Sequence, residues 1–557
     1  MFKLTIRARG LAAALLWLGA AAFSTAALAQ EETLSDLIRS GNREAVLAAI
    51  TSPDIDLNAA DPDGSTALLW ATYEVDHELV RALLKAGARA NVPNRFGAAP
   101  LTEAVKLGDV DLTRALLDAG ADPNSPNQDS QTALMLAASV GAPKVAELLI
   151  GRGANVNAVE TFRGQTALMW AAAANHAEVV EVLVAHGANV KVRAKYDDWS
   201  RQMTSEPRAQ FRHTGGLTAL LYAARSGCYG CAVAIVKAGA DVDQPNPDGI
   251  TPLINAIDNR GYDIAMLLLD KGANAGAWDM TGRTPLYVAV DMNSFKGGNG
   301  FNFGNPVEPR APNKATAMDV VNRLLNMGVD PNHELVRMRP NGYGRGRFSE
   351  YMLRGGTGPL MVAALGYDPE AIKALLTHGA EVDLPNVFRI TPLMAAAGLT
   401  GSFRSAIDPV GGTTPPAGDI QLHAIKVIDL LLDSGANINA RVTGNRTRTA
   451  RLSAYVYNRE NEGKSALFAA AEFGWDKVVR HLIDRGADPT LRDAAGKTAL
   501  DYAREPAPIS PGGTPADDTN GGRYATANRA ATVAILEPVS PQSAPKTGGD
   551  GNATAAK

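Results

Sequence analysis

One sequence frame returns along the chain at nearly constant spacing. It is a Thr or a stand-in, then Ala or Pro, then Leu, followed by small residues. Seven of the ten intervals between frames are 33 or 34 residues, and the others are 52, 74 and 74. Such a period indicates repeats that each bury an apolar face against their neighbours. The frames begin at Thr66, Ala99, Thr132, Thr166, Thr218, Thr251, Thr284, Gly358, Thr391, Ser465 and Thr498.

A second frame closes each unit. It reads Gly-Ala-Asp-Pro-Asn at 120–124 and Gly-Ala-Asn-Val-Asn at 153–157, and variants begin at Gly239, Gly435 and Gly486. Each copy follows an amphipathic stretch, so its glycine lies where a helix ends in a left-handed conformation. The Asx and Pro residues after the glycine then turn the chain into a loop.

With this period and these two frames, the chain resembles the ankyrin repeat family from about Thr33 to Ala503. The resemblance implies an all-α repeat solenoid of stacked helix-turn-helix units, each with a projecting β-turn finger. The family's opening is Thr-Pro-Leu-His, whereas the His position here is mostly apolar, as at Met135 and Met169. Ala-rich first helices, as at 170–174, let neighbouring units approach closely.

The first 29 residues have the layout of a secretory signal peptide. Basic residues at 3, 7 and 9 precede an apolar run that ends at Ala27-Leu28-Ala29. Cleavage there predicts a periplasmic protein, with secretion as the second choice. The alternative is an uncleaved membrane anchor, because 10–29 is almost long enough to span a bilayer. No later run is long and apolar enough to span.

The repeats define the remaining boundaries. Residues 30–64 are predicted to form a degenerate N-terminal capping repeat and 65–503 the solenoid. Residues 504–537 read as an interrupted C-terminal cap, with its second helix at 528–536. The Pro/Gly/Ser/Ala-rich tail at 538–557 is predicted to be disordered.

Five insertions account for the long intervals. Ankyrin units tolerate extra residues only in loops, because an insertion within a helix would destroy the stacking face. Two insertions lie between the helices of a unit, near 293–313 and 399–419. Three extend the fingers, near 191–216, 335–356 and 441–462.

The three finger insertions are basic and aromatic. Together they hold 16 basic and 6 acidic residues. Arg and aromatic side chains are enriched at protein–protein hot spots, so we expect these loops to form a binding ridge. The alternative is that they are solvated or pack back on the solenoid. The predicted partner-binding residues are Trp199, Arg337, Arg339, Tyr343, Arg345, Arg347, Phe348, Arg446, Arg448, Arg451, Tyr455 and Tyr457.

The charge balance narrows the class of partner. Without residues 1–29 the chain would keep 51 basic and 58 acidic residues, a net charge of −7. Nucleic-acid binding requires clustered cations on a basic surface and is not expected. The sequence predicts an adaptor that binds a protein with an acidic surface through its concave face and its fingers. A cell-wall polymer is the second choice of partner.

Cys228 and Cys231 are the only cysteines. Their Cys-x-x-Cys spacing at a helix start resembles a redox motif, but no thioredoxin-like βαβ pattern surrounds it. In an oxidising compartment we expect either a disulfide or two unreacted thiols. Two cysteines are too few for a zinc site.

Other motifs that resemble chemical sites are repeat turns. Gly-Lys-Ser at 463–465 and Gly-Lys-Thr at 496–498 lack the first glycine of a phosphate-binding loop. Asp-Pro-Asp-Gly at 61–64 lacks a full calcium ligand series. We therefore predict a non-enzymatic protein with no cofactor, metal or catalytic residue. The alternative is an enzyme, or enzyme subunit, acting on cell-wall or glycan substrates through the insertion loops.

Overall fold

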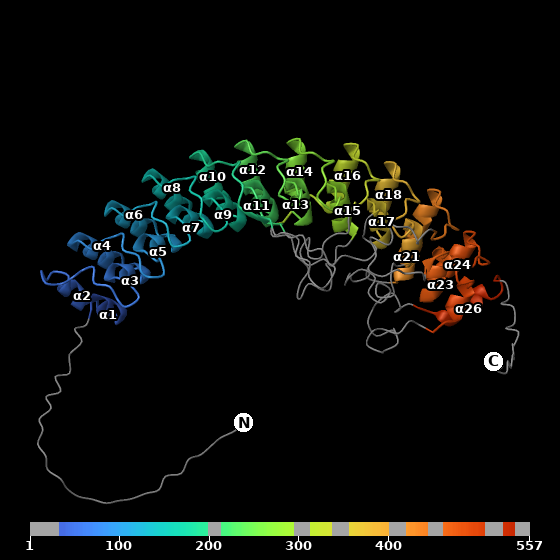
Figure 1. Ribbon diagram of the computed structural model, residues 1–557, viewed down its shortest axis with the longest axis horizontal. Coiled ribbons are helices and arrows are strands. Elements are labelled where there is room, and N and C mark those ends of the chain that lie inside the picture. Colours follow the sequence, from blue (N-terminus) through green and yellow to red (C-terminus); the bar gives the residue numbers. More distant parts are fainter. Residues whose placement is uncertain are drawn as a thin grey trace, which may run out of the picture.

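The computed structural model describes residues 33–198, 213–294, 312–336, 356–399, 419–443, 461–506 and 527–540. In these ranges, 24 helices form twelve antiparallel pairs, stacked in chain order into one curved solenoid (Figure 1). We number the pairs as repeats 1 to 12. The first helix of each pair lies on the concave side and the second on the convex side. The predicted all-α repeat solenoid is confirmed.

The concave helices begin one residue after the first sequence frame or its equivalent. They are α1 (Leu34–Arg39), α3 (Ala67–Tyr73), α5 (Pro100–Lys106), α7 (Ala133–Val140), α9 (Ala167–Ala174), α11 (Ala219–Ser226), α13 (Pro252–Asp258), α15 (Pro285–Ser294), α17 (Pro359–Leu365), α19 (Pro392–Ala396), α23 (Ala466–Phe473) and α25 (Ala499–Arg504).

The convex helices precede the closing frames. They are α2 (Arg43–Ala49), α4 (His77–Ala86), α6 (Val110–Asp118), α8 (Pro143–Gly151), α10 (Ala177–Ala185), α12 (Tyr229–Lys237), α14 (Tyr262–Asp270), α16 (Ala317–Asn326), α18 (Pro369–Thr377), α21 (Ile420–Asp433), α24 (Asp476–Asp484) and α26 (Arg529–Leu536). A short antiparallel hairpin, β1 (Tyr196–Asp198) and β2 (His213–Gly215), belongs to the first finger insertion.

The opening Thr caps the concave helix. Thr166 Oγ1 accepts a hydrogen bond from the Met169 amide at 3.4 Å, and Thr66 binds the Leu69 amide in the same way at 3.3 Å. A hydroxyl at this position satisfies an amide that has no partner within the helix. The side chains at the family's His position fill the core instead, and Met135 and Met169 are almost fully buried.

The closing frame links consecutive repeats. Its last Asx side chain binds the backbone of the next repeat: Asn157 Nδ2 donates to Gly187 O (3.1 Å), and its Oδ1 accepts from the Asn189 amide (2.7 Å). Asn91, Asn124, Asn332 and Asn439 make the same pair of bonds. These side chains form an asparagine ladder that adds directional bonds to the non-directional packing of the helices.

Specific side-chain contacts hold the first and last helices of the stack. At the start, Thr33 and Asp36 form a capping box on α1. At the end, α26 packs against α24 and α25, and its Arg529 binds carbonyl oxygens of Glu472, Tyr502 and Glu505. No helix within the described ranges is long and apolar enough to cross a membrane.

Candidate functional site: the concave pocket between repeats 5 and 6

The twelve residues predicted to bind a partner lie outside the described ranges. What the structure describes is the base of each extended finger. In each, the amide of one buried residue donates to the carbonyl of the residue before the concave helix cap: Ala194 to Leu217 (3.0 Å), Leu335 to Thr357 (3.1 Å) and Val442 to Lys464 (2.9 Å). A regular finger has the same bond, as from Asn127 to Gln131 (3.0 Å). The three insertions therefore leave the solenoid at equivalent points of their repeats.

The type of residue at this donor position distinguishes the regular fingers from the extended ones. In regular fingers it is usually Asn or Asp, whose side chain accepts amides two and four residues ahead, as Asn127 does at 3.0 and 2.9 Å. That side chain folds the chain into a tight turn. The extended fingers have Ala194, Leu335 and Val442 there, each at most 3% exposed. The sequence contains this signal, because an apolar residue stands at the Asn or Asp position in each extended finger.

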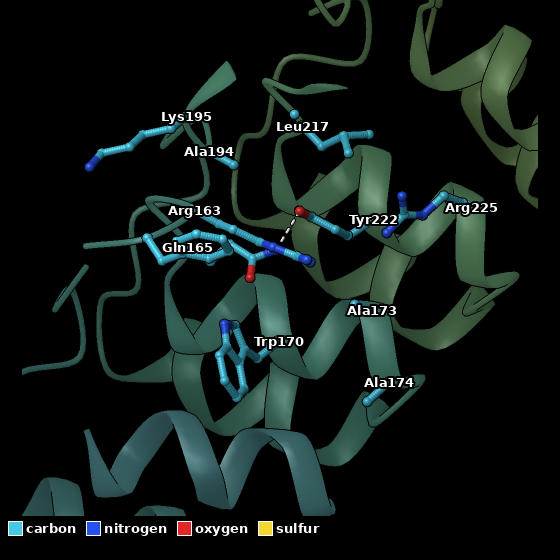
Figure 2. Close-up of a pocket in the computed structure, with 12 residues that line it drawn as sticks. Arg163, Gln165, Trp170, Ala173, Ala174, Ala194, Lys195, Leu217, Tyr222 and Arg225 are labelled. Atoms are coloured by element: carbon cyan, nitrogen blue, oxygen red, sulfur yellow. Dashed lines mark hydrogen bonds between the residues drawn. The ribbon is translucent and has the colours of Figure 1, made fainter. Parts of the chain in front are cut away.

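A pocket of about 830 Å³ opens on the concave side, between the first helices of repeats 5 and 6 (Figure 2). Its floor comes from α9 and α11, and its walls come from the finger before α9 and the base of the first extended finger. The lining residues are Phe162, Arg163, Gln165, Trp170, Ala173, Ala174, Ala194, Lys195, Gly215, Leu217, Tyr222 and Arg225.

The pocket is basic, and no acidic residue is among the described residues that line it. Arg163 lies 5.7 Å from the Phe162 ring centroid, Arg225 lies 4.9 Å from that of Tyr222, and Lys195 Nζ donates to Thr161 O at 2.5 Å. All three side chains are exposed, and within the described ranges none forms an ion pair with a carboxylate. The pocket therefore offers three positive charges to a ligand.

Aromatic side chains give the pocket its shape. Tyr222 is buried, and its hydroxyl accepts a hydrogen bond from Gln165 Nε2 at 2.5 Å, which joins the finger before α9 to α11 (Figure 2). Phe162 is 76% exposed at the rim. Half-buried Trp170 also lines the pocket, and its Nε1 is buried with no hydrogen-bond partner among the described residues. Cations beside aromatic rings favour the binding of an anionic group with an adjoining apolar surface.

Sequence reasoning missed these pocket residues. Trp170 and Tyr222 each lie four residues after the opening Thr of their repeat, a position that Leu136, Asn255 and Val288 occupy elsewhere. Aligning the repeats position by position would have shown aromatic residues in two successive repeats. The insertions and their basic and aromatic composition point instead to the long fingers.

The other candidate sites have structural roles. Cys228 caps α12 and is joined to Cys231 by a buried disulfide, one of the two states that the sequence left open. The glycines of the two Gly-Lys triplets lie in turns before α23 and α25. Within the part of the chain that the structure describes, no group of three His, Cys, Asp or Glu side chains could hold a metal ion.

Comparisons with known proteins agree with this architecture. The model of "Ankyrin repeats (3 copies)" matches residues 34–127, 101–194 and 220–297, and that of "Ankyrin repeat" matches residues 462–494. Together with twelve stacked helix pairs, these matches place the chain in the ankyrin repeat family. Protein–protein interaction is the general role that this family indicates.

Curated relatives match only in part. The chain is 37% identical over 82 residues to the E3 ubiquitin-protein ligase hecd-1 of Caenorhabditis elegans, covering 15% of this chain and 2% of the ligase. It is 28% identical over 154 residues to the ankyrin repeat and KH domain-containing protein mask-1 of the same organism, covering 23% and 6%. It is 31% identical over 148 residues to the mitochondrial disaggregase of Bos taurus, covering 26% and 21%. The chain thus covers about a fifth or less of each relative.

Proposed function

We propose that this chain is a non-enzymatic adaptor that binds an acidic segment of a partner protein through its concave face. One observation carries the proposal. Arg163, Lys195 and Arg225 surround a pocket lined by aromatic rings, and no carboxylate is among its described lining residues. A partner that brings negative charge would be attracted over a distance of roughly 8–10 Å at physiological salt and would gain charge-assisted hydrogen bonds on arrival.

The proposed location is the periplasm. It rests on the signal-peptide pattern of residues 1–29, which lie outside the described ranges. In that compartment the partner would be another exported protein, and a cell-wall polymer is the alternative ligand. The basic and aromatic residues of the three extended fingers are proposed to enlarge the binding surface, because their insertions leave the solenoid at equivalent points.

Site-specific photo-crosslinking in the cells that produce the protein tests this proposal. A benzophenone amino acid would replace Phe162 at the pocket rim, and in a matched control it would replace exposed Glu181 on convex helix α10 of the same repeat. We expect one protein to crosslink from position 162 and not from 181. The double variant Arg163→Glu, Arg225→Glu should abolish that product.

Two results would contradict the proposal. Identical products from both positions would show that the concave pocket does not select a partner. Recovery of glycan fragments alone from position 162 would favour the cell-wall alternative, and with it an activity on glycans.

A further inference from the structure

Two repeats have a tyrosine at the same position of the concave helix. Tyr222 in repeat 6 and Tyr502 in repeat 12 each lie four residues after the helix cap. The residue before the cap of the preceding repeat contacts each of them. Gln165 donates to the Tyr222 hydroxyl, and Lys464 Nζ lies 4.3 Å from the centroid of the Tyr502 ring. The two sites can therefore be compared residue by residue.

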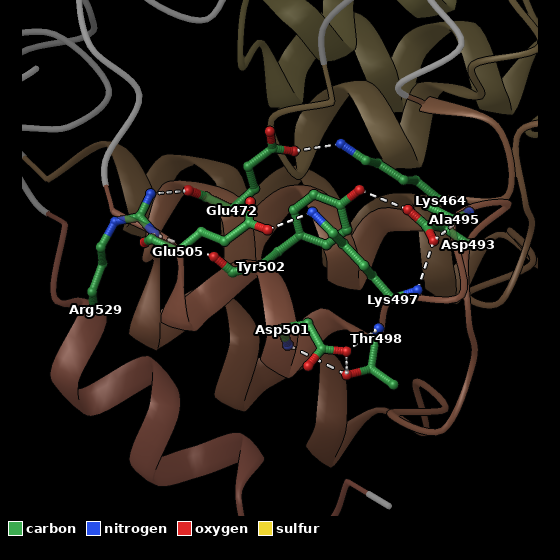
Figure 3. Close-up of polar contacts among 10 residues, drawn as sticks. All are labelled: Lys464, Glu472, Asp493, Ala495, Lys497, Thr498, Asp501, Tyr502, Glu505 and Arg529. Carbon is green, nitrogen blue, oxygen red and sulfur yellow. Dashed lines mark hydrogen bonds and ion pairs between the residues drawn. The ribbon is translucent and has the colours of Figure 1, made fainter. Parts of the chain in front are cut away.

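In repeats 11 and 12, carboxylates of the chain itself occupy the site (Figure 3). Lys464, only 2% exposed, pairs with Glu472 at 2.8 Å, and Lys497 pairs with Glu505 at 2.5 Å. Lys497 Nζ also lies 5.0 Å from the Tyr502 ring centroid. Two cations beside one ring are thus each neutralised by an acid from the end of a concave helix.

The pocket between repeats 5 and 6 lacks both acids. Ala173 holds the position that Glu472 has in repeat 11, and Arg225 holds the position that Glu505 has in repeat 12. Ala173 lines the pocket, so the space near Tyr222 is the space that a carboxylate side chain fills near Tyr502. The cation positions differ too, because Gln165 and Leu217 stand where repeats 11 and 12 have Lys464 and Lys497, and the cations of the open pocket are Arg163, Lys195 and Arg225.

We infer that Ala173 determines what this pocket binds, and that an Asp or Glu side chain of a partner peptide takes the place that Glu472 has in repeat 11. An apolar side chain next to that acid would pack on Phe162 and Trp170, the rings lining the same pocket. A peptide supplies both groups from neighbouring residues, whereas an acidic polysaccharide supplies the carboxylate without the apolar side chain. The inference rests on the proposed concave-face binding and specifies its chemistry.

The test gives the pocket its own carboxylate. In the full chain, Ala173→Glu should place an acid beside Tyr222, and Ala173→Gln is the matched neutral control. The probe is a fluorescein-labelled peptide of alternating aspartate and phenylalanine, measured by fluorescence anisotropy. We expect Ala173→Gln to bind within about threefold of the parent and Ala173→Glu to lose about tenfold, the equivalent of about 1.4 kcal/mol. A peptide with asparagine for aspartate should lose at least as much.

Equal binding by the glutamate and glutamine variants, or by the acidic and amide peptides, would overturn the inference. Stronger binding of an oligogalacturonate than of the peptide would overturn the choice of a peptide. If Ala173→Glu does not fold, Ala174→Glu on the exposed neighbouring lining residue gives the same comparison against Ala174→Gln. If the peptide experiment fails but the crosslink from position 162 is retained, the proposed protein binding is still supported. Only the inference that a carboxylate occupies the pocket is then wrong.

Discussion

Asn124 binds the backbone of Gly153 in the next repeat: its Nδ2 donates to that carbonyl oxygen at 2.8 Å. Its Oδ1 also accepts the Asn155 amide at 2.7 Å. One side chain therefore spans a repeat boundary with two bonds. Because similar bonds recur at several boundaries, the stack is held by local links as well as by packing between neighbours.

Asn124→Ala should remove both bonds and lower the free energy of unfolding by about 1–2 kcal/mol. Asn124→Asp keeps the acceptor and loses the donor, as at Asp243, whose Oδ1 accepts the Asn274 amide. The aspartate variant should therefore lose about half as much. Urea denaturation and hydrogen exchange in repeats 3 and 4 measure the effect. An equal free energy of unfolding for all three proteins would show that the asparagine ladder does not stabilise the stack.

Arg283 is a buried cation whose loss should be severe. Its side chain is 1% exposed, with Nε 2.6 Å from Asp279 and a terminal nitrogen 3.5 Å from Asp258. Burial alone would lower the pKa of Arg283, but the carboxylates outweigh burial and raise it above the ordinary value. Arg283→Met should cost about 3–5 kcal/mol, because buried carboxylates lose their cation.

The control for Arg283 is Arg43→Ala, which removes the ion pairs of an exposed arginine with Asp76 and Glu78 and should cost about 1 kcal/mol or less. Thermal and urea denaturation of both variants make the comparison. Similar losses would mean that Arg283 contributes no more than a surface ion pair.

Arg225 should contribute to binding and little to stability. It is exposed and stacks on Tyr222 without an acidic partner in the described ranges. Arg225→Gln should weaken binding of the aspartate–phenylalanine peptide by about tenfold at low salt and by less at about 1 M salt, where the Debye length is about 3 Å. The melting temperature should hardly change. A loss of binding independent of salt would contradict an electrostatic role.

The partly buried acid Glu334 predicts that the stability of the protein depends on pH. Burial, and secondly the charge of Glu381, raises the pKa of Glu334 above 4.5. An acid with a raised pKa in the folded state adds stability below its unfolded pKa, and this stability is lost as the pH rises through the folded value. Glu334→Gln should therefore be more stable than the parent at pH 7, by roughly 0.5 kcal/mol, and equal to it below pH 4.5. Melting curves at the two pH values test the sign, and a destabilised variant at pH 7 would refute it.

Arg529 should hold the last helix in place. It donates to the carbonyl oxygens of Glu505 (2.6 Å) and Tyr502 (3.3 Å) and to that of Glu472, so it joins α26 to the ends of α23 and α25. Arg529→Ala should increase hydrogen exchange throughout α26 and little in repeats 1 to 6, because repeat stability is local. Exposed Arg480 on α24 provides the control substitution. Unchanged exchange in α26 would assign its docking to apolar packing alone.

The fold could be predicted from the sequence because the same helix-start and helix-end residues recur in many repeats. The opening Thr and the closing Gly mark a helix start and a helix end, and even the early frame at Thr33 begins a capped helix. The pocket did not follow, because it depends on residues 165, 173, 222 and 225 meeting across two repeats. Periodicity gives the position of each residue within its own repeat. Which neighbouring side chains leave space between repeats becomes visible only when the units are stacked.

Regular and extended fingers have the same hydrogen bond at their base, so the length of a finger can vary while the helical stack below it is unchanged. Ala194, Leu335 and Val442 close their fingers with the bond that Asn127 makes in a finger of ordinary length. Doubling the length of a flexible loop costs only about 0.6 kcal/mol in closure entropy. Finger sequences could thus be lengthened, exchanged or grafted from another protein while the curvature of the solenoid stays the same. A lineage of such proteins could acquire new ligands without having to evolve a new scaffold.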